Sequence, residues 1–229
     1  MKISGPEKSA PPAVSLVGGR TIILASASQR RLDLLLQWGL HPRTLPATGV
    51  DEARVRGEAQ DVAMRLALEK AQWSRGQAIS GGQSESDLWV IGADTVVSVD
   101  GDVLGKPDNP DHARQMLRRL CGREHEVITA VAVIPPSGSP VVESETSTVI
   151  FKELCSAEIE AYVASGDGIG KAGAYGIQSA GARLVAGFRG CYYNIVGLPV
   201  KRTLALLEIA QRACDCSERD GWLGGRGCQ

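Results

Sequence analysis

The chain has 229 residues, with 25 Lys and Arg against 26 Asp and Glu, a formal net charge of −1 and 4% aromatic residues. This near-neutral charge argues against a protein that coats nucleic acid or an anionic membrane, and the few aromatic residues argue against extended base-stacking surfaces. No apolar run approaches the roughly 20 residues that span a bilayer.

The two ends of the chain differ in composition from its middle. Residues 1–20 are rich in Pro and Gly and lack the apolar core of a signal peptide, which predicts a flexible leader. Residues 212–229 are polar and end in a Gly-rich stretch, which predicts a flexible tail. One domain is therefore expected over residues 21–211. The six cysteines show no zinc-binding spacing, so we expect reduced thiols and a cytoplasmic protein.

Predicted strands and helices alternate along this domain. Short apolar or alternating runs predict strands over residues 21–25, 88–97, 126–134, 141–151 and 182–186. Apolar residues at helical spacing predict helices over residues 29–38, 59–74, 111–120, 156–165 and 198–210. A polar loop rich in Gly and Ser is expected over residues 76–85. The alternation favours an α/β sandwich around a mixed sheet.

The turn between the first strand and the first helix has the features of an anion site. Ser26, Ala27 and Ser28 are small, and their hydroxyls and backbone N–H groups lie at a predicted helix N-terminus. Arg30 and Arg31 follow in the first helical turn, where a cation opposes the helix dipole unless an external anion offsets it. The pattern favours phosphate binding, and two solvated surface arginines are the alternative.

The most informative segment spans residues 88–107. Its apolar strand carries the carboxylate of Asp94, whose burial costs several kcal/mol unless a positive group meets it. Residues 100–101, Asp-Gly, predict a two-residue hairpin turn. Continuing the register of that hairpin places Lys106 opposite Thr95, one residue from Asp94. A purely structural Asp–Lys pair is the alternative.

Further candidates are distributed along the chain. Asp51 and Glu52 are adjacent acids, a pattern typical of a solvated loop, with Mg²⁺ ligation as the alternative. Lys70, late in the second helix, either reaches a phosphate or lies on the surface. Gln178 ends a Gly-rich loop over residues 171–178, which either approaches a ligand closely and contacts a base edge or forms a tight turn. The three histidines are expected to be structural or surface residues.

A series of segments, in order, resembles the Maf family, also called the septum-formation-inhibitor-like nucleotide pyrophosphatases. The segments are LASASQRR (24–31), GVDE (49–52), LEKA (68–71), VIGADTVV (90–97), LGKP (104–107), LCGREHEVITAV (120–131), TVIFKEL (148–154), KAGAYGIQ (171–178) and YYNIVGLPV (192–200). They cover roughly residues 21–208, and their number and order carry the resemblance. One departure is Gln29, where the family usually has a proline that would preset the first helical φ.

The resemblance implies an elongated three-layer α/β sandwich of the inosine-triphosphatase-like type, with a mixed central sheet and two lobes around a cleft. It also implies metal-dependent hydrolysis of a nucleoside triphosphate to the monophosphate and pyrophosphate. Mg²⁺ is the expected cofactor, with Mn²⁺ as the alternative, and a homodimer is expected by analogy.

The family's functional residues fall on matching positions of this chain. Asp94 takes the position of the catalytic base, and Glu52 and Asp94 are the expected metal ligands. The phosphate-binding positions are Ser26, Arg30, Arg31, Lys70 and Lys106. Arg30, Thr95 and Gln178 resemble the specificity set of the subgroup that acts on dTTP and UTP.

Three other functions stay open on the sequence alone. They are a phosphatase that removes the γ-phosphate, a non-catalytic nucleotide-binding regulator of cell division, and a nucleic-acid binder, the last disfavoured by charge.

Overall fold

A computed structural model describes residues 20–223 of the chain. Within these residues, seven strands form one mixed sheet. The strands are β1 (Thr21–Leu24), β2 (Arg43–Thr44), β3 (Leu88–Val99), β4 (Asp102–Leu104), β5 (Glu124–Ile134), β6 (Val141–Phe151) and β7 (Val185–Arg189). Their order is β2-β1-β3-β5-β6-β7, and β4 pairs with β3. β1 is parallel to β2 and β3, and the remaining pairs are antiparallel.

Helices cover both faces of this sheet. They are α1 (Gln29–Gln37), α2 (Ala59–Ser80), α3 (Pro110–Leu120), α4 (Ser156–Ala164), α5 (Tyr192–Val196) and α6 (Val200–Leu223). Because side chains alternate along a strand, Trp89 and Ile91 of β3 pack in the core shared with α1, α3, α4, α5 and α6, whereas Leu88 and Val90 pack against α2. The expected three-layer α/β sandwich is therefore confirmed.

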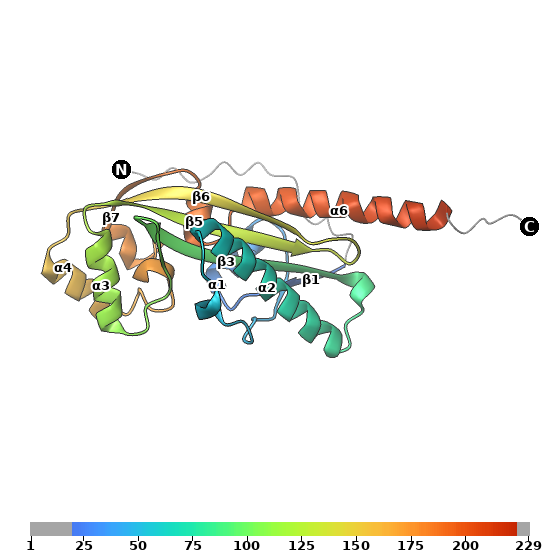
Figure 1. Ribbon diagram of the computed structural model, residues 1–229, viewed down its shortest axis with the longest axis horizontal. Coiled ribbons are helices and arrows are strands. Elements are labelled where there is room, and N and C mark those ends of the chain that lie inside the picture. Colours follow the sequence, from blue (N-terminus) through green and yellow to red (C-terminus); the bar gives the residue numbers. More distant parts are fainter. Residues whose placement is uncertain (1–19, 224–229) are drawn as a thin grey trace, which may run out of the picture.

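The molecule is elongated, as expected. Figure 1 shows α3 and α4 at one end of the long axis, while α6 runs along the sheet towards the other end. The division into two lobes stays a prediction. No helix within residues 20–223 combines the length and the apolar character that crossing a membrane requires.

Strand pairing is interrupted along one edge of β3, and the candidate site lies at this interruption. β1 pairs with residues 88–91 of β3, and β4 pairs with residues 97–99. Between these stretches, β3 pairs with β5 on its other side, but no described strand fills the edge next to β1. Such a crevice beyond the carboxyl end of a parallel strand is a frequent ligand site. Asp94 and Thr95 lie at this gap.

Two helices are longer than the sequence analysis predicts. α2 continues to Ser80 through part of the expected loop, because Gly76 costs only about 1 kcal/mol in a helix and Ala78 is buried beyond it. α6 continues past the expected end at residue 210 to Leu223, because the fully buried Cys214 extends its apolar stripe into the expected tail. The last strand also starts later than expected, at Val185.

The predicted ends of the domain fall largely outside the structure. Residues 1–19 of the expected leader and residues 224–229 of the expected tail lie outside the described residues. The leader's flexibility therefore stays a prediction.

Candidate active site

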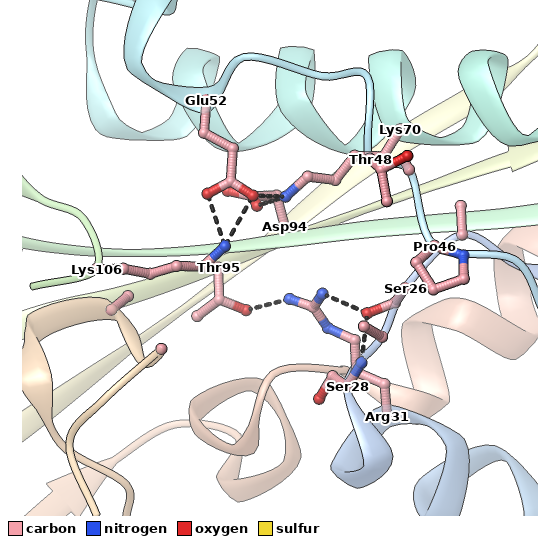
Figure 2. A pocket seen from close by; sticks show the side chains of 15 residues that line it. Ser26, Ser28, Arg31, Pro46, Thr48, Glu52, Lys70, Asp94, Thr95 and Lys106 are labelled. Atoms are coloured by element: carbon pink, nitrogen blue, oxygen red, sulfur yellow. Dashed lines mark hydrogen bonds and ion pairs between the residues drawn. The ribbon is translucent and has the colours of Figure 1, made fainter. Parts of the chain in front are cut away.

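A cavity of about 400 Å³ opens at the gap in β3 (Figure 2). Its walls come from the turn between β1 and α1, the segment before α2, the middle of α2 and β3, and the two loops that follow β4 and α4. The lining residues are Ala25, Ser26, Ala27, Ser28, Arg31, Pro46, Ala47, Thr48, Glu52, Lys70, Asp94, Thr95, Lys106, Gly170 and Ala172.

Four side chains of alternating charge form a row along one wall. Lys70 Nζ contacts Asp94 Oδ1 and lies 2.8 Å from Glu52 Oε1. Lys106 Nζ lies 2.7 Å from Glu52 Oε2. Lys70 and Asp94 are buried, whereas half of the Lys106 side chain is exposed. With Arg31 the cavity holds three cations against two carboxylates, so the lining carries a net positive charge.

Close packing of α2 against β3 brings Lys70 to Asp94. A Cβ on Gly92 would lie 2.2 Å from the Ala67 carbonyl oxygen and 2.8 Å from Ala71 Cβ, so only glycine allows this approach. Gly92 and Asp94 point to the same face of the sheet because side chains alternate. Lys70 lies one helical turn from Ala67 and therefore meets Asp94 on that face.

Glu52 is strongly ionised in this row. Partial burial alone would raise the pKa of Glu52, but the charge of Lys70 and the hydrogen bonds from Lys106 and Lys70 outweigh burial and lower that pKa to about 2. Its neighbour Asp51 does not line the cavity, and its exposed carboxylate lies 3.2 Å from Arg54 Nε. Of the two adjacent acids, the structure thus brings one to the cavity.

Arg31 forms the opposite wall, held by three acceptors. Its Nε donates to the Gly197 carbonyl oxygen at 2.8 Å, its Nη1 to Ser26 Oγ at 3.2 Å and its Nη2 to Thr95 Oγ1 at 3.0 Å. Burial is the main cause that lowers the pKa of Arg31, partly opposed by the charge of Asp94. Guanidinium groups remain charged under such conditions, so Arg31 presents a fixed positive charge to the cavity.

The helix N-terminus also reaches the cavity. α1 begins at Gln29, as expected, and Ser28 occupies its N-cap position without a side-chain capping bond. Ser28 donates its backbone N–H to Ser26 Oγ at 3.2 Å. Ser28 and Ser26 line the cavity, where the N-terminal N–H groups of a nine-residue helix favour an anion.

The structure gathers most of the predicted site residues in this cavity. Those that line it are Ser26, Arg31, Glu52, Lys70, Asp94, Thr95 and Lys106. Arg30 and Gln178 do not line it. Gln178 is exposed, although Gly170 and Ala172 of the loop before it form part of the wall.

The predicted partner of Asp94 is wrong. The hairpin has the expected register, with Val99 opposite Asp102, but its ladder ends at Leu104. Lys106 therefore lies beyond the paired strands, and its ammonium turns to Glu52. Lys70 contacts Asp94 instead. It therefore does not lie on the solvent-exposed surface of α2, which was one of its two expected positions.

The sequence analysis did not predict some of the residues that line the cavity. Pro46, Ala47 and Thr48 belong to the irregular segment before Glu52, and their composition carries no ligand signal. Their one sequence clue is the position directly before GVDE. Behind the wall, Asn194 is fully buried and hydrogen-bonded to β5 and β6, a role beyond simple core packing.

The carboxylates of Glu52 and Asp94 are oxygen ligands of the kind that a divalent cation uses. Lys70 contacts both Glu52 and Asp94, so their oxygens converge on one region of the cavity. Mg²⁺ is usually held by one or two carboxylates together with substrate phosphates and water. Within residues 20–223, no group of three or more His, Cys, Asp or Glu side chains forms a complete metal site. The protein alone thus offers part of a coordination shell.

Comparison with known proteins identifies the family to which the chain is similar. A family model described as Maf-like protein matches residues 21–210. A dTTP/UTP pyrophosphatase of Moorella thermoacetica is 46% identical over 190 residues, which cover 82% of this chain and 94% of the relative. A protein of the same name from Hyphomonas neptunium is 44% identical over 192 residues, covering 83% and 96% of the two chains.

A solved structure is also similar. The HAM1 protein from Coxiella burnetii matches with a TM-score of 0.45 at 14% identity, over 86% of this chain and 99% of that chain. The family assignment does not depend on it, because the sequence match alone covers nearly the whole described domain. This chain belongs to the Maf family.

Proposed function

We propose that the protein is a nucleoside triphosphate pyrophosphatase that hydrolyses dTTP and UTP to the monophosphate and pyrophosphate. The observation that carries the proposal is the cavity at the gap in β3, where Arg31, Lys70 and Lys106 surround two carboxylates beside a helix N-terminus. A triphosphate matches this excess of positive charge and these N–H groups. Relatives that are 40–46% identical over most of the chain are named dTTP/UTP pyrophosphatases, and we take the proposed substrates from these names.

In this proposal Asp94 is the general base. Lys70 contacts Asp94 Oδ1, and the Asp94 carboxylate lines the cavity, where a water molecule can reach it. Asp94 would accept the proton of that water as its oxygen attacks the α-phosphorus. The new P–O bond forms as the bond between the α-phosphorus and the bridging oxygen breaks, and pyrophosphate leaves with the bonding electron pair.

The cations of the cavity would stabilise the leaving group. Arg31, Lys70 and Lys106 neutralise the negative charge that develops on pyrophosphate, and Ser26 adds a hydroxyl donor. In the free protein, Lys106 is engaged by Glu52 and remains half exposed, so its ammonium can move to a phosphate without crossing the core. Arg30 and Gln178 lie outside the cavity lining, and their proposed contacts are with a part of the nucleotide that extends beyond the cavity.

A divalent cation fits beside Glu52 and Asp94, and Mg²⁺ is the proposed ion, with Mn²⁺ as the alternative. When bound, it would supply charge neutralisation and orientation of the phosphates. We further propose a cytoplasmic location, consistent with the free cysteines among the described residues, and a homodimer by analogy with the family.

Product identity tests the proposed function. Wild-type protein with Mg²⁺ is expected to release pyrophosphate and monophosphate from dTTP and UTP, faster than from CTP, 7-methyl-GTP or the purine triphosphates. Chelation of the metal should stop the reaction. Asp94→Asn should reduce turnover about a hundredfold or more while remaining folded, because it removes the proton acceptor. Thermal unfolding of the variant is the control for folding.

The alternatives predict different products. Release of orthophosphate would contradict the proposal and support a phosphatase that removes the γ-phosphate. Binding of nucleotide without any turnover would support a non-catalytic regulator. Full activity of Asp94→Asn would contradict the assignment of the base while leaving the reaction intact.

A further inference from the structure

A line of hydrogen bonds runs from Arg31 into the core behind the cavity. Arg31 Nη2 donates to Thr95 Oγ1 at 3.0 Å, and Thr95 Oγ1 lies 2.9 Å from Thr129 Oγ1. Thr129 Oγ1 donates to the backbone carbonyl oxygen of Asn194 at 2.8 Å. Thr129 and Asn194 are fully buried and do not line the cavity. This buried line links the cavity wall to α5.

The direction of each hydrogen bond in this line follows from its two ends. A carbonyl oxygen can only accept, so the single hydroxyl proton of Thr129 points to Asn194. Thr129 Oγ1 must then accept the proton of Thr95. Thr95 has no second proton, and its oxygen faces Arg31 as an acceptor, which agrees with a guanidinium that can only donate. Thr95 is thereby fixed as an acceptor.

Ser26 is also an acceptor for Arg31, but its hydroxyl proton is not directed into the core. Its Oγ accepts from the Ser28 backbone N–H at 3.2 Å and from Arg31 Nη1 at 3.2 Å. Both acceptor positions of a hydroxyl are then used, and its proton remains available for a ligand. Arg31 itself uses three N–H groups on Ser26, Thr95 and Gly197, which leaves two of its five donors for a ligand. The wall therefore presents only donors to a bound phosphate from Ser26 and Arg31.

Asn194 is held in place from two strands. Its side-chain Oδ1 accepts from the Thr129 backbone N–H at 3.0 Å. Its Nδ2 donates to the Val127 carbonyl oxygen at 2.8 Å and to Ser147 Oγ at 2.9 Å. Every polar group of this side chain has a partner on β5 or β6, which fixes the carbonyl that orients Thr129.

We propose that Thr129 and Asn194 are positioning residues that fix the hydroxyl of Thr95 as an acceptor and so hold Arg31 with two donors free for the substrate's phosphates. The inference rests on the proposed function for the identity of the ligand. Without the Thr129 hydroxyl, the Thr95 proton loses its buried acceptor and turns towards Arg31, where it opposes the guanidinium N–H groups. Arg31 would then lose its alignment although no residue of the cavity lining had changed.

A double-mutant cycle between Thr129→Val and Thr95→Val tests this inference. Valine has the shape of threonine without the hydroxyl. The readouts are kcat and KM for dTTP, the Kd of inorganic pyrophosphate by calorimetry, and thermal unfolding. Thr129→Val is expected to weaken pyrophosphate binding and lower kcat/KM about tenfold, the size of one lost hydrogen bond to a charged group. In the Thr95→Val background, the same change should have little further effect on either quantity.

Thr129→Ser is the matched control, because it keeps the hydroxyl and should restore binding close to wild type. An equal loss from Thr129→Val in both backgrounds, or no rescue by Thr129→Ser, would show a merely structural role and overturn the inference. If Thr129→Val does not fold, Thr129→Ala replaces it in the same cycle. Pyrophosphate binding separates the two proposals: absence of nucleotide turnover in the wild type contradicts the proposed function, while the binding cycle still decides this inference.

Discussion

Asp94 is a carboxylate inside a twelve-residue strand, and its environment explains how the charge persists there. Lys70 contacts Oδ1, and Glu52 in turn contacts Lys70, so each buried charge has an opposite neighbour. Pairs of this kind add little net stability, because desolvation offsets their attraction. Their alignment at the cavity therefore points to chemistry, since an apolar pair of similar volume would stabilise the sheet as well.

His125 is a buried ionisable residue that lies outside the cavity. Its Nε2 is 2.8 Å from Tyr175 Oη, its ring packs edge-on against Phe151, and its Nδ1 has no partner in the described part of the chain. Burial lowers the pKa of His125 to about 4. The unfolded chain therefore binds a proton near pH 6.5 that the folded chain takes up only near pH 4.

The free energy of unfolding should consequently decrease as pH falls through this window. Between about pH 7 and pH 5, His125 alone is expected to remove about 2 kcal/mol, because the protonated form is favoured only in the unfolded state. Urea unfolding of the wild type and of His125→Gln at both pH values measures the effect. The variant should show a smaller decrease over this range. An identical pH dependence in the two proteins would contradict a neutral, buried His125.

At the scale of elements, the contact between α2 and β3 sets the geometry of the charged row. It depends on Gly92, where α2 approaches the strand backbone, and on Lys70 one turn along the helix from Ala67. The gap between β1 and β4 leaves the edge of β3 open at the same level. Packing on one face and a missing neighbour at the edge together make Asp94 buried and yet accessible.

Substitution by alanine should change the stability of the protein in opposite directions at Gly92 of β3 and Gly76 of α2. Gly92→Ala is expected to destabilise the fold by about 2 kcal/mol and to reduce turnover, because its methyl group pushes α2, with Lys70, away from Asp94. Gly76→Ala, on the exposed face of α2 with open space around it, should stabilise by up to about 1 kcal/mol. Thermal unfolding and pyrophosphate release check both variants. Equal stability of the two would contradict the close approach at Gly92.

At the scale of the whole molecule, one sheet joins two cores that close on opposite faces. The described residues of these cores extend from Ile22 to Cys214. The cavity is assembled from segments between Ala25 and Ala172 that meet only in the folded chain. Figure 1 shows that α6 continues along the long axis past this part of the sheet.

A chain reduced to residues 20–215 is therefore expected to fold and to act on dTTP like the full chain. Both cores and the complete cavity wall are retained, including Cys214, whose Sγ lies 3.0 Å from the Ser137 carbonyl oxygen. Thermal unfolding and steady-state kinetics of the two chains provide the comparison. A large loss of activity in a folded, shortened chain would assign a role to the removed ends.

The sequence by itself determined the properties that depend on neighbouring residues. The period of two in β3 places Asp94 and Thr95 on opposite faces, and the Asp-Gly turn sets the hairpin register. The small-residue turn before Arg31 marks a helix N-terminus for the same local reason. The ordered family segments add the expected reaction and most of the residues that line the cavity.

The tertiary structure alone decided which distant groups meet. Lys70 rather than Lys106 reaches Asp94, because the distance between α2 and β3 depends on packing at Gly92 and not on strand register. The continuation of α6 depends on a buried place for Cys214. The polarity of Thr95 depends on the Asn194 carbonyl, which belongs to another element far along the chain. Such contacts arise from three-dimensional packing, which local periodicity does not encode.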